Sequence, residues 1–324
     1  MKTSLIKLSI ALIVLILVGM FTFFRFFTEE PGQMNAVGLL VPDTINDQGW
    51  GTKGYKALID IGNQFDVNVF YREKINSKEQ VESAIKEFQR QGVNFIIGND
   101  NHYVQIFNEI SNKYPDIHFV SVNGKAENRN TTSVNFDGYA MGYFGGMVAS
   151  KMSKTGNLGV IAAYKWQGEI QGFIDGAKFQ NPETNVMVKY VDDWDDDEKA
   201  LQYLDELILK NVDVFYPAGD GYNVPVIEKV KEKGLFIIGY VSDQRDLGEN
   251  TVLTSTVQHI DTLYSIVAEE FNNGTLKNGT FYFDFRDDVI TMGRYSPLVS
   301  KAYQEKIKRY IENYKISGTF PKKE

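Results

Sequence analysis

The stretch that decides the fold is residues 41–58, VPDTINDQGWGTKGYKAL. It follows an apolar strand at 37–41, passes through a loop of turn-forming residues, and enters a helix that we expect to begin near Trp50. In an open α/β sheet, strand carboxyl ends and helix amino ends converge on one crevice, where ligands bind. Trp50 therefore stands either as a platform for a ligand or as a lid on the core.

The rest of the chain repeats this pattern of an apolar strand followed by a helix. From residue 36 onward, short apolar runs alternate with segments of helical periodicity, which predicts parallel sheets with crossover helices. A loop rich in Asn, Lys and Thr at 123–132 separates two such series, so we expect two α/β lobes with a cleft between them. The expected strands are 37–41, 67–71, 94–97 and 118–122 in the first lobe and 158–162, 186–191, 212–216, 236–240 and 252–255 in the second.

The expected domain boundaries follow from these series. The first lobe comprises 36–132 with about 256–285, and the second comprises 133–255. Residues 286–324 end in a basic amphipathic helix and are expected to form a C-terminal crossover and packing segment. Residues 31–35 contain a Pro-Gly breaker and serve as a linker.

Residues 1–30 predict a membrane anchor or a signal segment. The run from Leu8 to Phe24 is uncharged and almost wholly apolar, and about 20 such residues cross the hydrocarbon of a bilayer. Its exit, FTFFRFF, lacks the small residues of a cleavage site, which favours an uncleaved transmembrane helix. Lys2 and Lys7 precede the span. We therefore expect a single N-terminal span in the plasma membrane, with the body outside the cytoplasm.

Charge and composition exclude several classes of function. The formal net charge of −8 argues against a nucleic-acid surface, because phosphate contacts need clustered Lys and Arg. The absence of Cys excludes disulfides, thiolate metal sites, Cys nucleophiles and a lipid-modified Cys anchor.

Motifs of catalysis are missing from the sequence. It contains no G-x-S-x-G elbow and no phosphate-binding G-x-x-x-x-G-K-[ST] loop. The turn that contains Gly219 and Gly221 resembles a dinucleotide fingerprint, but Val224 replaces the third Gly, so we interpret it as a tight turn that exposes helix N–H groups. The three histidines lack metal-ligand spacing. The sequence therefore predicts a binding protein without catalytic residues, metal or cofactor, rather than an enzyme.

The acidic run at 192–198, DDWDDDE, has two interpretations. Six carboxylates could bind a cation, but the run leads straight into a helix at 199–210 and lacks the glycine of an ion loop. Acidic residues at a helix amino end complement its dipole, so capping is the favoured interpretation. Trp194 lies in this run just after a strand of the second lobe. It is either a second ligand platform, equivalent to Trp50, or a cap on the core.

Several motifs resemble those of one protein family. They are PDTINDQGW at 42–50, GYFGG at 142–146, SKTG at 153–156 and the pair Ala218-Gly219. These are similar to the basic membrane protein (BMP) family of solute-binding lipoproteins, which includes the purine-nucleoside receptor PnrA. The resemblance covers nearly everything after residue 35.

The resemblance implies a fold and a mode of action. The fold is a Venus-flytrap protein of the type 1 periplasmic-binding kind, in which two Rossmann-like lobes close on a small ligand. The ligand is a purine nucleoside or a related molecule, which an ABC permease receives. The missing lipid-anchor Cys would be replaced by the hydrophobic segment at 1–30.

The resemblance also assigns roles to single positions. Two aromatic residues that sandwich the base fall on Trp50 and Trp194, and Asp43 opens the first loop. The polar grip differs: Gly51 stands for an Asn, Val241 for a ribose-binding Asp, Gln258 for a Lys and Asn123 for an Asp, with Asp137 a second candidate nearby. The candidate ligand-binding residues are Asp43, Trp50, Gly51, Asn123, Asp137, Trp194, Gly219, Gly221, Val241, Asp243 and Gln258.

A second function stays open. Within the family, the runs WDDDEKA and YPAGDGYNVPVI resemble most closely a bacillus regulator of competence. The alternative is therefore a regulatory protein that acts indirectly on competence gene expression and has no transport role.

Overall fold

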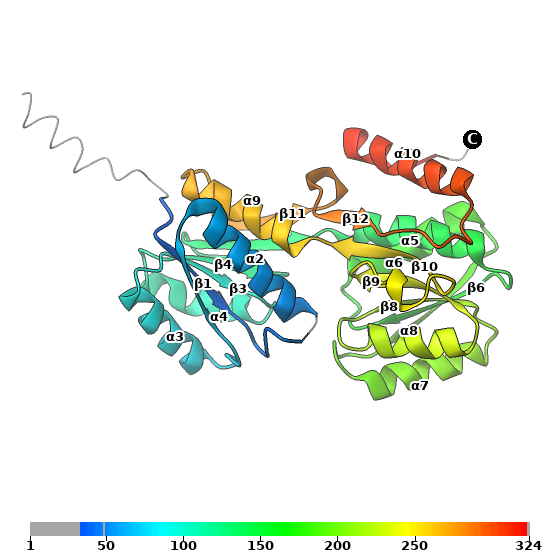
Figure 1. Cartoon of the computed structure of the whole chain (residues 1–324), viewed down its shortest axis with the longest axis horizontal. Coiled ribbons are helices and arrows are strands. Elements are labelled where there is room, and N and C mark those ends of the chain that lie inside the picture. The colour runs from blue at the N-terminus through cyan, green and yellow to red at the C-terminus, as the bar shows by residue number, and fades with distance from the viewer. Residues whose placement is uncertain (1–32, 48, 323–324) are drawn as a thin grey trace, which may run out of the picture.

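The computed structural model describes residues 33–47 and 49–322 and contains two six-stranded sheets, one in each lobe (Figure 1). The first sheet has the order β11-β5-β4-β3-β1-β2, with all paired neighbours parallel. The two-lobe α/β prediction is confirmed. The strands of the first sheet are β1 (Ala36–Leu40), β2 (Asn68–Arg72), β3 (Phe95–Gly98), β4 (His118–Val122), β5 (Thr131–Phe136) and β11 (Gly279–Phe283).

The second sheet has the order β12-β10-β9-β8-β6-β7 and is parallel except for the antiparallel edge strand β12. Both sheets thus repeat one arrangement, with the first strand of each series beside the second and the third. The strands of the second sheet are β6 (Asn157–Ala162), β7 (Asn185–Tyr190), β8 (Val214–Ala218), β9 (Phe236–Val241), β10 (Val252–Gln258) and β12 (Ile290–Met292).

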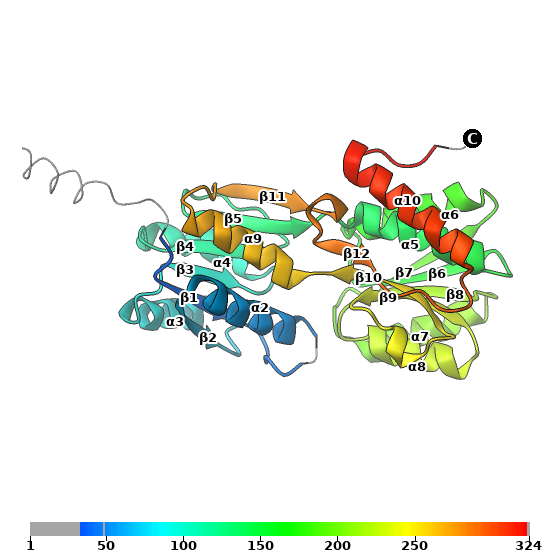
Figure 2. The same ribbon diagram turned by 45° about the horizontal axis from the view of Figure 1, so that its top comes forward.

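Helices cover both faces of each sheet (Figure 2). In β1, alternate side chains enter different cores: Val37 and Leu39 pack with α2 and α9, whereas Ala36 and Leu40 pack with α3 and α4. The helices are α2 (Trp50–Phe65), α3 (Lys78–Arg90), α4 (Tyr103–Ile110) and α9 (Ile260–Asn272) in the first lobe and α5 (Gly138–Met152), α6 (Gly168–Gln180), α7 (Asp197–Ile208), α8 (Asn223–Glu232) and α10 (Lys301–Ser317) in the second.

Side-chain caps fix the starts of two helices. The side chains of Ser77 and Gln80 form a capping box at α3. Asp196 caps α7 by accepting a hydrogen bond from the Lys199 N–H, and acidic residues fill the first turn. The end of the acidic run, Asp196 to Glu198, therefore caps and begins α7, which confirms the capping interpretation for these residues.

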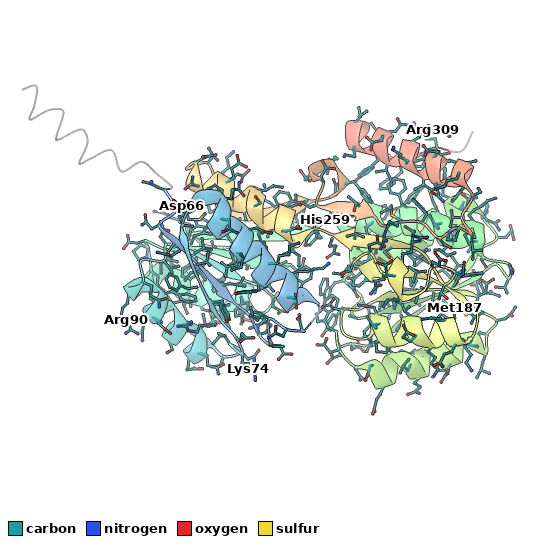
Figure 3. The ribbon with its side chains drawn as sticks, in the orientation of Figure 1. Asp66, Lys74, Arg90, Met187, His259 and Arg309 are labelled. Carbon is teal, nitrogen blue, oxygen red and sulfur yellow. The ribbon has the colours of Figure 1, made fainter. Side chains whose placement is uncertain are left out.

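The chain crosses between the lobes at three places. β5 leads into α5 at Asp137, β10 leads into α9 at His259, and β11 leads back to the second lobe at Asp284. His259 is labelled in Figure 3, at the junction of the lobes. Because the chain crosses at three places, we expect the lobes to move relative to each other by a hinge motion.

These crossings differ from the expected boundaries. The expected boundary at 132–133 lies inside β5, which the structure assigns wholly to the first sheet, and β10 extends three residues beyond the expected 252–255. The sequence of β5, TTSVNF, has no apolar run. Its polar side chains can be buried because they form hydrogen bonds. Thr132 Oγ1 donates to the Lys277 carbonyl at 2.9 Å, and Asn135 Nδ2 donates to the Phe281 carbonyl at 3.2 Å. Periodicity therefore could not find this strand.

The segment at 286–324, expected to be a crossover and packing segment, also contributes a strand to a sheet. It contributes the edge strand β12, and the preceding β11 closes the first sheet. Within 33–47 and 49–322, no helix has both the length and the apolar composition to span a membrane. The expected anchor at 1–30 lies outside the described residues.

Glycine brings α5 and α6 into backbone contact. A Cβ built on Gly142 would lie 1.9 Å from the Glu169 carbonyl oxygen, and one on Gly176 would lie 1.9 Å from that of Tyr143. Gly146 and Gly172 meet the opposing backbone in the same way. The four-residue spacing on both helices gives each a flat stripe that admits no side chain.

We expect Gly142→Ala to destabilise the second lobe. Its methyl group would overlap a backbone oxygen that cannot move without separating the helices, which costs on the order of 1–3 kcal/mol or more. The melting temperature in a thermal unfolding scan should fall by several degrees.

Gly145→Ala in the same helix is the matched control. Its Cβ would meet Thr256 Cγ2 at 3.4 Å, an ordinary contact, and alanine favours a helix by about 1 kcal/mol over glycine. Equal melting temperatures for the two variants would contradict this account of the α5–α6 contact.

Candidate functional site

A cavity of about 1110 Å³ lies between the lobes, at the carboxyl ends of strands from both sheets. Its walls are the loops that follow β1, β3, β4 and β5 in the first lobe and β6, β7, β8 and β9 in the second. This volume exceeds the usual 300–1,000 Å³ of small-molecule pockets.

The structure brings ten of the eleven sequence-predicted residues to this cavity. The exception is Gly219, which lies under the ring of Tyr222, where a Cβ would be 2.0 Å from Cζ. Gly219 thus permits close packing beneath the loop rather than forming the cavity wall. The residues that line the cavity are Asp43, Trp50, Gly51, Asn123, Asp137, Trp194, Gly221, Val241, Asp243 and Gln258.

The amino end of α2 forms the wall of the first lobe. Asp47 accepts backbone hydrogen bonds from Gly49 at 2.9 Å and from Gly51 at 2.7 Å. Gly51 is needed because a Cβ there would lie 2.2 Å from the Thr44 carbonyl oxygen. The half-buried ring of Trp50 packs edge-on against Phe136, with centroids 6.0 Å apart.

Trp166 and Trp194 line the facing wall and form an aromatic group with Tyr164. Trp194 contacts Tyr164 and Trp166 edge-on, with centroid distances of 5.3 and 5.8 Å, and Tyr164 stacks on Trp166. Trp166 is 57% exposed, which leaves most of its ring open to the cavity or to solvent. The Gly221 N–H donates to the Trp194 carbonyl at 3.0 Å and holds this loop.

Lys53 and Asp220 join the two lobes. The Trp50 N–H donates to Asp220 Oδ2 at 3.3 Å, and Lys53 Nζ donates to the Val241 carbonyl at 2.7 Å. Burial lowers the pKa of Lys53 to about 8, against the opposing charges of Asp220 and Asp261. Burial likewise raises the pKa of Asp220, against the Trp50 N–H and the Lys53 charge. Both charges are held in a partly dehydrated contact between lobes.

The loop after β9 carries backbone strain. Val241 has a φ of +64°, a left-handed conformation that β-branched residues rarely adopt, and its carbonyl is the one that accepts from Lys53. Nearby, Asp243 accepts from Arg294 Nε at 2.6 Å, so its charge is already paired. The Lys53 amine that contacts the Val241 carbonyl comes from the other lobe.

A buried polar network lies behind the cavity in the second lobe. Glu169 Oε1 accepts from the Tyr240 hydroxyl at 3.0 Å and from Gln167 Nε2 at 2.9 Å. Burial raises the pKa of Glu169, against those hydrogen bonds. Both Glu169 and Gln167 line the cavity at the start of α6.

Sequence reasoning missed several lining residues. Trp166 follows β6, so the rule that selected Trp50 and Trp194 could have found it. Phe136 ends β5, a strand without an apolar signature. Glu169 and Tyr240 are 71 positions apart, and no local pattern links them.

Among the residues that the structure describes, no group of three or more His, Asp or Glu side chains is placed to hold a metal ion. The arrangement of the cavity is instead that of a binding site, with aromatic walls and hydrogen-bonding loops.

Comparison with known proteins agrees with this architecture. The family model of PnrA-like ABC transporter substrate-binding proteins, Bmp, matches residues 34–324. The transcriptional activator protein med of Bacillus subtilis is 50% identical over 297 residues, covering 92% of this chain and 94% of that protein. A purine-binding protein of Brucella abortus is 26% identical over 80% of this chain and 75% of its own length.

Solved structures give the same result. The crystal structure of a transcriptional activator of the comK gene from Bacillus halodurans has a TM-score of 0.84 and 48% identity, covering 89% of this chain and all of that one. An ABC solute-binding protein from Conexibacter woesei shares the fold, with a TM-score of 0.71 at 16% identity, over 89% of this chain and 98% of its own. The chain belongs to the PnrA-like family of ABC transporter substrate-binding proteins.

Proposed function

We propose that this chain is an extracytoplasmic solute-binding protein, anchored in the bacterial plasma membrane by residues 1–30, that binds a small nucleoside-like ligand and presents it to an ABC permease. One observation carries the proposal: Trp50 and Trp194 line a single cavity from opposite lobes. A planar ring between them gains stacking energy of about 1–3 kcal/mol per base. The related purine-binding protein of Brucella abortus supports a purine-like ring.

Lobe closure is the second part of the proposal. Lys53 and the Trp50 N–H reach across the cleft to the Val241 carbonyl and to Asp220. In a flytrap mechanism such contacts form as the lobes close, and a ligand that touches both walls stabilises the closed state.

Calorimetric titration of the full chain in detergent, against a panel of nucleosides and nucleobases, tests the ligand class. We expect a binding signal with at least one of them. Trp50→Ala should weaken that binding about 5- to 150-fold, because it removes one stacking surface.

Trp50→Phe is the matched control, because it retains a ring and should retain most of the affinity. No heat with any compound of the panel, together with an unchanged melting temperature, would reject the nucleoside proposal. If Trp50→Ala binds the ligand as tightly as the wild type, Trp50 covers the core and does not contact the ligand.

The pH dependence of stability tests the buried Lys53 contact. Its folded-state pKa of about 8 lies below the ordinary 10.5, so the native state binds fewer protons than the unfolded state between these values. This group therefore adds stability as pH rises from about 8 to about 10.5. In urea unfolding, the free energy of unfolding of the wild type, relative to that of Lys53→Met, should increase across that pH range.

Lys56→Met, on the exposed part of the same helix, controls for the loss of one positive charge. If the wild type and Lys53→Met have parallel stability profiles across this range, the Lys53 amine is not desolvated between the lobes.

A regulatory role is the second candidate. Two relatives near 50% identity are a transcriptional activator protein and an activator of the comK gene. The net charge of −8 disfavours direct contact with DNA, so this role would act indirectly on competence gene expression. The loss of ribose-binding charge at Val241 supports it as well.

The genomic neighbourhood separates these two functions. Transport predicts genes for a permease and an ATPase beside this one, because the three components work as one importer. Regulation without transport predicts a gene that stands apart from importer components. Inspection of the flanking genes in the source genome checks both.

A further inference from the structure

The charged side chains that line the cavity are mostly acidic. Its lining includes nine acidic side chains and one basic side chain, Lys125, and the ammonium group of Lys125 lies 3.7 Å from Glu127. Such an imbalance in a partly closed cleft concentrates negative potential where a ligand would sit.

Some of these carboxylates are already neutralised. Asp243 and Asp246 share Arg294, at 2.6 and 2.7 Å, and Asp220 faces Lys53. Others are not. Within 33–47 and 49–322, Asp43, Asp47, Asp137 and Asp195 form no ion pair with Lys or Arg, although all four line the cavity.

The unpaired carboxylates of the two lobes repel one another. Asp195 belongs to the second lobe and still reaches solvent, yet partial desolvation raises its pKa. The charges of Asp193 beside it, and of Asp43, Asp100 and Asp47 across the cleft, raise it further. Closure therefore brings like charges together unless something positive lies between them.

Two side-chain amides at the cavity also present oxygen atoms that can accept hydrogen bonds from a ligand. Gln258 is only 7% exposed and lines the cavity; its Nε2 contacts Met141 Sδ at 3.7 Å, and its Oε1 accepts no hydrogen bond from any described residue. Asn135, also 7% exposed, donates Nδ2 to the Phe281 carbonyl, and its Oδ1 likewise accepts none from the described chain. Two amide oxygens of mostly buried side chains thus lie at the cavity without donors from the described chain.

Aromatic walls complete the set. The faces of tryptophan rings attract cations, most strongly where water is excluded, and Trp50, Trp166 and Trp194 all line the cavity. Carboxylates, amide oxygens and indole faces together form the environment in which proteins hold alkylated or protonated nitrogen.

We infer that the ligand of this cavity carries a positive charge on nitrogen, and that it is a nucleoside-like or other small organic cation rather than a neutral nucleoside. The charge is held by Asp43, Asp47 and Asp195, with N–H donors directed to Gln258 and Asn135. The inference rests on the proposed binding function and specifies its ligand class.

Two matched pairs of probes isolate the charge. 1-Methyladenosine is protonated, and so is a cation, at neutral pH, whereas its isomer N6-methyladenosine is neutral, with the same non-hydrogen atoms and a similar shape. Choline and 3,3-dimethylbutanol form the same contrast without a nucleobase. Calorimetric titration of the full chain should show at least tenfold tighter binding, about 1.4 kcal/mol, for the cation of one pair, and the preference should weaken as salt is raised.

The variant Asp195→Asn removes one unpaired carboxylate at nearly constant volume. It should reduce the preference for the cation several-fold and leave the affinity for the neutral partner unchanged. Asp116→Asn makes the same change of charge in the exposed turn before β4, at the amino end of that strand and away from the cavity, and should leave both affinities unchanged. Melting temperatures of the two variants check that both fold.

The outcomes separate the inference from the proposed function. If N6-methyladenosine binds as tightly as 1-methyladenosine, the cation inference is wrong while nucleoside binding stands. Binding of choline alone supports the cation inference and rejects the nucleoside ligand. If neither cation binds, the inference is wrong, and neutral nucleosides in the wider panel then decide the proposed function separately.

Discussion

Backbone contact between α5 and α6 is the constraint on which the second lobe depends. Glycines on both helices remove the side chain at the points where the two backbones meet, so the two axes approach closely there. This approach places the first turn of α6, with Gln167 and Glu169, directly behind the cavity. The aromatic loop that precedes α6 is therefore held against a rigid support, which is what a binding wall requires.

Several energetically costly features lie together at the cleft. Lys53 is partly dehydrated, Val241 adopts a left-handed conformation, and carboxylates of the two lobes face one another. Each feature opposes stability, and each lies on a loop or helix end at the interface of the lobes. Local conflict of this kind marks functional sites, because surrounding structure maintains it for the sake of a ligand or a movement.

The proposed ligand would be held by groups that differ from those of the nucleoside binders. The resemblance of the sequence to the family places aromatic residues at Trp50 and Trp194, and it places Val241 and Gln258 where nucleoside binders are expected to carry charged residues. Trp166 adds a third indole, and unpaired acidic groups remain. Under the proposed function, the aromatic walls would accept a flat molecule and the polar contacts would select among such molecules. Both the transport and the regulatory candidates are compatible with a cleft of altered selectivity.

The sequence by itself determined the features that depend on near neighbours. Alternation of apolar strands and helices, the capping box at Ser77 and the cleft position of Trp50 follow from periodicity and turn chemistry within a few residues. The tertiary structure alone decided the rest. β5 is a strand because polar side chains found partners in distant segments, and Lys53 meets a carbonyl 188 positions away. Gly219 does not line the cavity, because the ring of Tyr222 packs on it. The partners of β5 and of Lys53 lie far away in the sequence, so no local pattern encodes those contacts.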